Sequence, residues 1–282
     1  MTTSTKKPVT SNAAKFRVDS PNGRMYGWGN ETFHSVTTIL SALGKPWLGA
    51  WAAKMVAEYA YDYRAEWESL PKAGAVRLLK GAPWEKRDAA GDLGTAVHDA
   101  IEAAVLGQTP PEYPADVAAR MSHWDRFLSD YRPEFLASEA AVFSRKHRYA
   151  GTLDAIARIG DETLLLDVKT SKDVYPDYAL QLAAYRHAEF LGLPDGTEAE
   201  IPPTDGGAVL HITPDDYRLV RVRTDEEVFR TFLYVAQAHR WQKEISKTAV
   251  LDPVPIPSSA AEALSTLVRE FDGELVPAEE EN

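Results

Sequence analysis

Residues 139–169, which read EAAVFSRKHRYAGTLDAIARIGDETLLLDVK, decide the fold of this chain. The segment contains apolar runs of strand length separated by short polar stretches, a pattern typical of consecutive strands joined by tight turns. The Gly-Asp pair at 160–161 supplies the second turn. We therefore expect a three-strand meander. Its strands are expected over Glu139 to Ser144, Ala150 to Ile159 and Thr163 to Lys169.

The segments on both sides of this meander show mostly helical spacing of apolar residues. One more pair of strands, around a Pro-Asp-Asp turn at 214–216, is expected near the C-terminal end. The expected order of elements along the chain is helices, three strands, a helix, two strands and a helix. This order predicts an α/β (α+β) fold with a central mixed sheet flanked by helices. The expected helices are 36–43, 47–67, 71–79, 83–90, 94–106, 115–131, 177–191 and 225–245, and the strand pair is 208–213 with 217–222.

The chain is expected to form one main domain with less ordered ends. Residues 1–15 are rich in Ser, Thr and Lys and are predicted to be disordered. Residues 16–250 are predicted to form a single domain, with an N-terminal helical part at about 35–131 and a core at about 94–245. Residues 251–282 are predicted to be a Pro-rich linker followed by an acidic tail.

Composition excludes several classes of site. The 282 residues include no cysteine, which excludes disulfides, thiolate zinc sites, cysteine nucleophiles and cysteine-held iron–sulfur clusters. No run approaches the roughly 18 apolar residues of a membrane span, and the polar N-terminus lacks the apolar core of a signal peptide. We therefore expect no membrane association and a cytoplasmic location.

The charge balance bears on possible partners. Forty-two acidic residues against 31 Lys and Arg give a net charge of −11, and residues 262–282 carry seven acids and one base. Proteins that coat DNA without sequence preference are usually basic, because neutralising phosphates drives their binding. The composition therefore argues weakly against a DNA coat and says little against a metal-dependent DNA enzyme.

Two neighbouring strands of the expected meander each carry an acidic residue among small and apolar ones. Asp167-Val168-Lys169 closes the apolar run 164–166, and Asp154 lies in the preceding strand. Residues two apart share one face of a strand, so Asp167 and Lys169 point the same way. Carboxylates on adjacent strands suit Mg²⁺ or Mn²⁺, and a lysine beside metal ions would have a lowered pKa and could activate water. The alternative is a surface Asp/Lys pair on an edge strand.

Further polar residues lie at helical spacing on either side of the meander. His98 and Glu102 are four apart on the helix expected over 94–106, and Gln181 and Tyr185 are four apart after Lys169. Each pair alone has an ordinary structural explanation as packed or surface residues. Their order along the chain is more specific: G-x-x-x-H, then G-T-x-D, then D-x-K, then Q-x-x-x-Y.

With these motifs the sequence resembles the PD-(D/E)xK nuclease superfamily, in the RecB-like and phage exonuclease branch. The resemblance covers about His98 to Tyr185 and implies a restriction-endonuclease-like core with an N-terminal helical elaboration. It also implies a Mg²⁺- or Mn²⁺-dependent nuclease that hydrolyses phosphodiester bonds in DNA. Leu153 stands where the family name has Pro, and the iron–sulfur cluster of many relatives is excluded, so the resemblance is to cluster-free members.

The resemblance implies a role for each matching residue. His98, Asp154, Asp167 and the backbone carbonyl of Val168 would hold metal, and Asp154, Asp167 and Lys169 would be catalytic. Gln181, Tyr185 and Glu139 would bind substrate or support the site. Two further candidates for this role come from the residues themselves: Glu102, one helical turn from His98, and Arg148, from the basic stretch 145–148.

The expected substrate is single-stranded DNA or DNA ends, and the expected setting is phage or bacterial recombination or repair, with recombination proteins as possible partners. One alternative is a non-catalytic DNA-binding accessory protein that retains the fold. Another is a metal-binding structural protein with no nucleic-acid partner. The sequence does not indicate the oligomeric state.

Overall fold

The computed structural model describes residues 8–10, 13–20, 23–108 and 112–254, and near the C-terminus residues 259, 262, 263 and 265. The chain divides into two compact units, Met1–Gln242 and Lys243–Asn282. The first unit contains every strand of the described residues, and the second includes the short 3₁₀ helix η3, Ile245–Thr248.

The predicted meander is confirmed and forms the centre of the sheet. Strands β5 (Glu134–Ser144), β6 (Tyr149–Ile159) and β7 (Glu162–Lys169) pair in antiparallel order. Strand β10 (Gly206–Ile212) then joins β7 in parallel, and β11 (Tyr217–Val222) closes that side in antiparallel pairing. The prediction of a mixed sheet is therefore confirmed.

The N-terminal residues extend the other side of the sheet. Strands β2 (Arg17–Ser20), β3 (Gly23–Trp28) and β4 (Glu31–Ser35) pair in antiparallel order, and β4 joins β6 in parallel. Two elements correct the predicted disorder of residues 1–15. They are β1 (Val9–Thr10), which pairs with β5, and the 3₁₀ helix η1 (Ala13–Phe16). Residues 1–7 lie outside the described residues.

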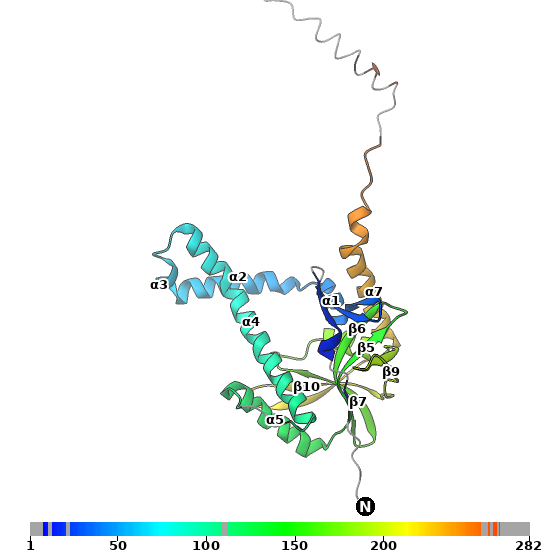
Figure 1. The fold of residues 1–282 in the computed structure, drawn as a ribbon. Coiled ribbons are helices and arrows are strands. Elements are labelled where there is room, and N and C mark those ends of the chain that lie inside the picture. Colours follow the sequence, from blue (N-terminus) through cyan, green and yellow to red (C-terminus); the bar gives the residue numbers. More distant parts are fainter. Residues whose placement is uncertain are drawn as a thin grey trace, which may run out of the picture. The chain divides into compact units, whose positions relative to one another are not determined.

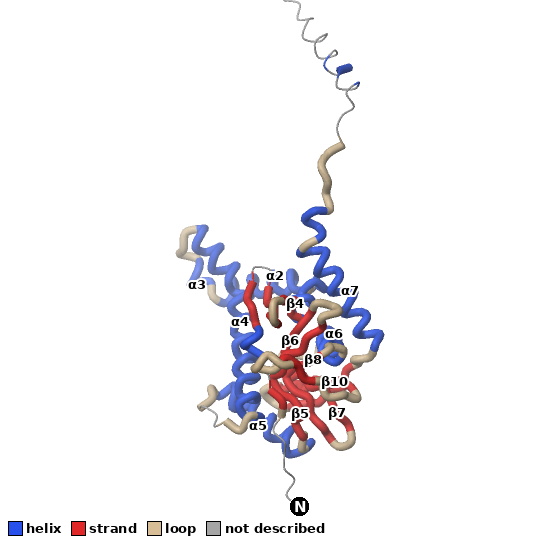
Figure 2. The backbone as a smooth tube through the Cα atoms, turned by 45° about the vertical axis from the view of Figure 1, so that its right-hand side comes forward, coloured by secondary structure: helices blue, strands red, loops and turns tan. Residues whose placement is uncertain are grey.

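Two helical layers cover the sheet (Figures 1 and 2). Leu164, Leu166 and Val168 of β7 pack in a cluster with apolar side chains of α4 and α5, whereas Leu165 packs in a separate cluster with side chains of the other layer. Because successive side chains of a strand point to opposite faces, β7 contributes residues to both clusters. The layers are α4 (Lys72–Val105) with α5 (Ala115–Tyr131), and α1 (Val36–Leu40) with α6 (Asp177–Arg186) and α7 (Glu226–Lys243).

A helical arm precedes the sheet-covering part of α4. After η2 (Ser41–Leu43), Gly44 takes a left-handed φ of 66°, and α2 (Pro46–Asp62) begins with a proline, which suits a first turn. Helix α3 (Arg64–Trp67) leads into α4, which packs along α2. None of the described residues of α2 or α3 is fully buried.

Four of the expected helices are corrected by the structure. The separate helices predicted over 71–79, 83–90 and 94–106 form one 34-residue helix, α4, which continues through the buried Pro83. An internal proline in a helix costs roughly 3 kcal/mol, and Pro83 is buried in α4. The helix predicted over 177–191 ends at Arg186, because Phe190–Gly192 forms strand β8 against β5. Strand β9, Glu198–Ala199, pairs with β8.

Among the described helices, none combines the length and the apolar character needed to span a membrane.

Candidate metal centre and cleft

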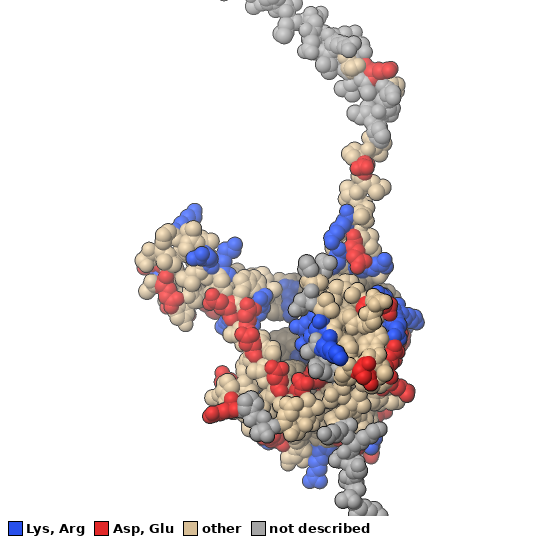
Figure 3. Space-filling model, viewed as in Figure 1, with Lys and Arg blue, Asp and Glu red and all other residues tan. Residues whose placement is uncertain are grey.

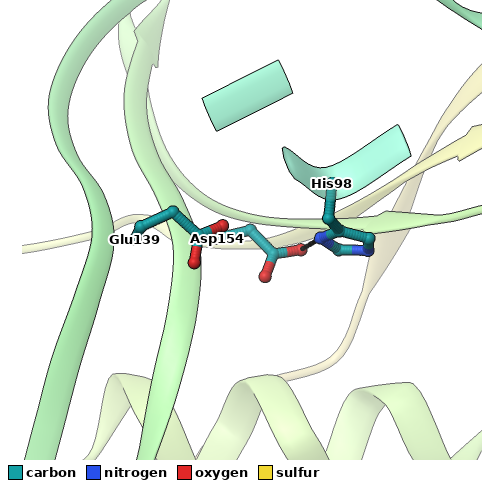
Figure 4. Close-up of side chains that lie close together, drawn as sticks. All are labelled: His98, Glu139 and Asp154. Atoms are coloured by element: carbon teal, nitrogen blue, oxygen red, sulfur yellow. Dashed lines mark ion pairs between the residues drawn. The ribbon is translucent and has the colours of Figure 1, made fainter. Parts of the chain in front are cut away.

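Three potential metal ligands come together where α4 meets the sheet. The side chains of His98 from α4, Glu139 from β5 and Asp154 from β6 each offer one ligand atom within 4.8 Å of the others. The carboxylate of Asp154 lies between the other two groups in Figure 4. Its Oδ2 is 3.5 Å from Nδ1 of His98. We call these residues the ligand trio.

Backbone geometry holds the two carboxylates in place. Oδ2 of Asp154 accepts a 2.7 Å hydrogen bond from the backbone N–H of Val168, which ties β6 to the end of β7. Glu139 lies opposite Asp154, because Ser138 pairs with Ala155 and Ala140 with Leu153. Glu139 has a φ of 45°, a left-handed conformation that costs a non-glycine residue about 1–3 kcal/mol. Such strain within a strand is typical of residues under a functional constraint.

The environment of Glu139 favours its protonated form. Burial raises its pKa to about 9, and the negative charges of Asp154 and Glu102 add to this, against the opposing charge of Arg17. Burial also raises the pKa of Glu102, with a further contribution from Asp99. The trio therefore lacks enough positive charge to balance its acids. One imidazole nitrogen and two carboxylate oxygens at this spacing fit a divalent cation such as Mg²⁺ or Mn²⁺.

Asp167 and Lys169 form a buried ion pair next to the trio. Asp167 is 1% exposed, and its Oδ2 is 2.5 Å from Nζ of Lys169. Its Oδ1 accepts a 2.9 Å hydrogen bond from Nε2 of Gln181 on α6. Asp167 therefore lies on the face of β7 that α6 covers, and it is not a member of the trio. Of the predicted ligand side chains, the structure brings His98 and Asp154 together and adds Glu139.

The surroundings of this pair favour a protonated Lys169, whereas a general base needs a neutral lysine. Burial raises the pKa of Asp167 to about 6, although Lys169 opposes the shift. Burial lowers the pKa of Lys169, but the charges of Asp167 and Asp154 outweigh this, so its pKa is raised. The lowered lysine pKa expected beside bound metal ions stays a prediction, and without a bound ion the pKa of Lys169 is raised. Lys169 is a cation, held between Asp167 and the ring of Tyr178, whose centroid is 5.0 Å from Nζ.

Gly151 has a packing role that the motif does not reveal. A Cβ at position 151 would lie 2.4 Å from Cε1 of Tyr185, so only glycine allows this ring to approach β6. The hydroxyl of Tyr185 accepts a 3.3 Å hydrogen bond from Nε2 of Gln181. The glycine of G-T-x-D and the Gln/Tyr pair thus belong to one packed unit behind Asp167.

The trio opens into a cleft of about 880 Å³. Of the predicted site residues, the cleft wall includes His98, Glu102, Glu139, Asp154, Lys169, Gln181 and Tyr185. Arg148 is not part of this wall. It forms an ion pair with Glu31, and its guanidinium lies 4.9 Å from the ring centroid of Phe33. Val168 contributes a backbone N–H to Asp154 rather than a cleft-lining side chain.

Sequence reasoning missed a set of basic and aromatic residues that also line the cleft. They come from strands β2 and β3, from the residue before α2 and from α4, and none of them belongs to a motif. The only sequence signal is the alternation of polar residues at 17, 19, 24 and 26, which indicates one polar face of a hairpin. These residues are Arg17, Arg24, Tyr26, Lys45 and Arg87.

Comparison with known proteins does not identify a family. No protein-family model matches the chain, and no curated protein matches it. Among solved structures, the crystal structure of SSO0001 is similar with 15% sequence identity and a TM-score of 0.29. The match covers 47% of this chain and 62% of that one, less than two thirds of its length. A likeness of this size carries no argument about function.

Proposed function

We propose that this chain is a metal-dependent nuclease that hydrolyses phosphodiester bonds in DNA. The observation that carries the proposal is the ligand trio, His98, Glu139 and Asp154, beside the buried Asp167–Lys169 pair at the wall of a cleft with cationic side chains. The order of the motif residues along the chain supports the same reaction. The setting that fits best is exonuclease action in phage or bacterial DNA recombination or repair, alongside other recombination proteins.

The chemistry follows from the residues present. A divalent cation bound by the trio would neutralise charge on the scissile phosphate and lower the pKa of a water molecule. Asp154 is oriented for this by its hydrogen bond from Val168. Glu139 must give up its proton before it can ligate, because its pKa lies near 9.

Lys169 supplies a positioned positive charge next to the trio. Its ammonium group is 2.5 Å from Asp167, which orients it, and Gln181 holds Asp167 from the other side. A fixed cation can orient the attacking water or stabilise the negative charge that develops on the phosphate. Gln181, Asp167 and Lys169 therefore form a chain of polar interactions that sets the position of the ammonium group.

The test is cleavage of end-labelled single- and double-stranded oligonucleotides with Mg²⁺, Mn²⁺ or EDTA. We expect metal-dependent cleavage by the wild type and a loss of at least about 10²-fold in Asp154→Asn, because the ligand atom is replaced by a neutral amide. Asp161→Asn, on the turn between β6 and β7, is the control and should cut at the wild-type rate.

Two outcomes would decide against the proposal. Cleavage by Asp154→Asn at the wild-type rate would show that the trio is not the site. Oligonucleotide binding without cleavage in any metal would instead support the non-catalytic DNA-binding accessory protein. That alternative needs the cleft but not the trio.

A further inference from the structure

The hairpin formed by β2 and β3 turns one face into the cleft. Arg17 lies opposite Tyr26 in the register of the two strands, and Arg24 lies two residues from Tyr26 on the same strand. Residues opposite each other, or two apart, share a face of a hairpin. All three side chains line the cleft into which the ligand trio opens. We call them the hairpin face.

This hairpin face is fixed to the strand that carries Asp154. Tyr26 is 2% exposed, and its hydroxyl makes a 2.9 Å hydrogen bond with Oγ1 of Thr152. Nη2 of Arg17 lies 3.5 Å from the same Thr152 oxygen. Because Thr152 is two residues from Asp154 on β6, Arg17 is held close to the trio. On the other side, Oγ1 of Thr38 donates a 3.2 Å hydrogen bond to the carbonyl of Arg24.

The two arginines differ from Lys169 in their availability. Lys169 is paired with Asp167, whereas neither Arg17 nor Arg24 forms an ion pair with any carboxylate among the described residues. Both side chains are exposed in the cleft. The positive charge of Arg17 acts on the acids of the site, since it opposes the raised pKa values of Glu139 and Glu102. The arginines are therefore available to an anionic ligand next to the trio.

The distribution of charge around the cleft favours a ligand with repeated negative charges. In Figure 3 acidic side chains lie along α4, and basic side chains gather near the N-terminal strands. Arg17 and Arg24 are offset by two residues along the hairpin, about 7 Å at the rise of a strand. A polyanion whose charges recur at a similar interval can contact both. A pocket of this volume takes a ligand of a few nucleotides at most.

We propose that the hairpin face binds successive phosphates of a single nucleic-acid strand and leads that strand to the ligand trio. Arg17 contacts the phosphate nearer to Asp154, and Arg24 contacts the next one. Tyr26 holds the hairpin in place through Thr152. The part of this inference in which the bound strand is led to the ligand trio rests on the proposed function. Binding of the strand to the hairpin face does not require cleavage.

The experiment measures binding of a fluorescein-labelled oligothymidylate by anisotropy in EDTA, which prevents metal-dependent cleavage. Arg17→Ala and Arg24→Ala should each weaken binding about tenfold or more at low salt, the scale of a hydrogen bond to a charged group. The slope of log K against log salt should fall by about 0.7 for each phosphate that a variant no longer neutralises. Arg158→Ala, a surface arginine on β6 outside the cleft wall, should leave affinity and slope unchanged.

The outcomes separate this inference from the nuclease proposal. Wild-type affinity and salt slope in both hairpin variants would overturn it, whether or not the protein cleaves DNA. Absence of oligonucleotide binding by the wild type would overturn it as well. Weakened binding in both variants would support the hairpin face even if no metal gives cleavage, and in that case only the nuclease proposal fails. Matching thermal midpoints of the variants and the wild type would confirm that each variant is folded.

Discussion

Binding of Mn²⁺ at pH 7 should release about one proton for each ion, and Glu139 is the expected source. Its carboxyl has a pKa of about 9 because of burial and the nearby charges of Asp154 and Glu102. At pH 7 the side chain is therefore neutral in the metal-free protein. A carboxyl group ligates a hard cation in its deprotonated form, so the cation must displace the proton.

The size of the effect follows from the distance between pH 7 and the pKa of Glu139. Two pH units correspond to about 3 kcal/mol, or roughly 100-fold in affinity. The association constant for Mn²⁺ should therefore rise about tenfold for each pH unit between 7 and 9 and level off above pH 9. Proton release should fall from about one per ion at pH 7 to about half at pH 9.

Isothermal titration calorimetry measures this release directly. Titrations in two buffers that differ in ionisation enthalpy give the number of protons released for each ion bound. Glu139→Gln keeps the shape of the side chain but has no proton to lose, so its release at pH 7 should fall by about one. Glu198→Gln is the control, because that exposed carboxyl has a lowered pKa and is already ionised.

The result that would refute the reasoning is tight binding of Mn²⁺ at pH 7 with no proton release and no change in affinity up to pH 9. Such a result would mean that Glu139 is already ionised or is not a ligand. Equal proton release by the wild type and Glu139→Gln would place the source elsewhere.

Three further predictions concern stability and catalysis. Gly151→Ala should destabilise the protein by about 1–3 kcal/mol, because the new methyl group overlaps the ring of Tyr185. Urea unfolding should show a smaller loss of stability from Gly151→Ala when Tyr185 is also replaced by Leu. The stability of the metal-free protein should fall as pH rises from about 4.5 towards 9, since the folded-state pKa values of Asp167 and Glu139 are raised to about 6 and 9. In thermal melts, the midpoint of Glu139→Gln should fall less steeply with rising pH than that of the wild type. Equal slopes would contradict the raised pKa of Glu139. Lys169→Arg should lose roughly 10²-fold in kcat if the lysine exchanges a proton with the attacking water, because arginine stays protonated. Near-wild-type cleavage at saturating DNA would leave only a charge-stabilising role.

Much of the fold follows from local patterns in the sequence. The meander, its Gly-Asp turn and helix α5 at Ala115–Tyr131 lie where periodicity and turn residues predict them. These features depend on residues a few positions apart, so one sequence is enough to find them. The expected helix over 177–191 was wrong, because β5 offers Phe190 and Leu191 a strand partner 40 or more residues away. Local spacing does not contain that information.

The candidate site, like the fold, was predicted from the sequence only in part. The order of the motifs along the chain predicts His98, Asp154 and Asp167 as metal ligands. Only the tertiary structure shows which of these side chains lie close together. Asp167 faces α6 and Gln181, while Glu139 completes the group with His98 and Asp154. The partnership of Glu139 depends on the register of β5 against β6 and on a left-handed backbone at one residue.

The hairpin face is the clearest case of a feature that only tertiary structure reveals. Arg17 and Arg24 precede His98 by more than 70 positions, and nothing in their spacing indicates a site. They reach the cleft because β4 pairs in parallel with β6 and Tyr26 bonds to Thr152. Residue types and their periodicity determine elements and candidate chemistry. Strand register and long-range packing determine which side chains meet, because those interactions depend on the whole folded chain.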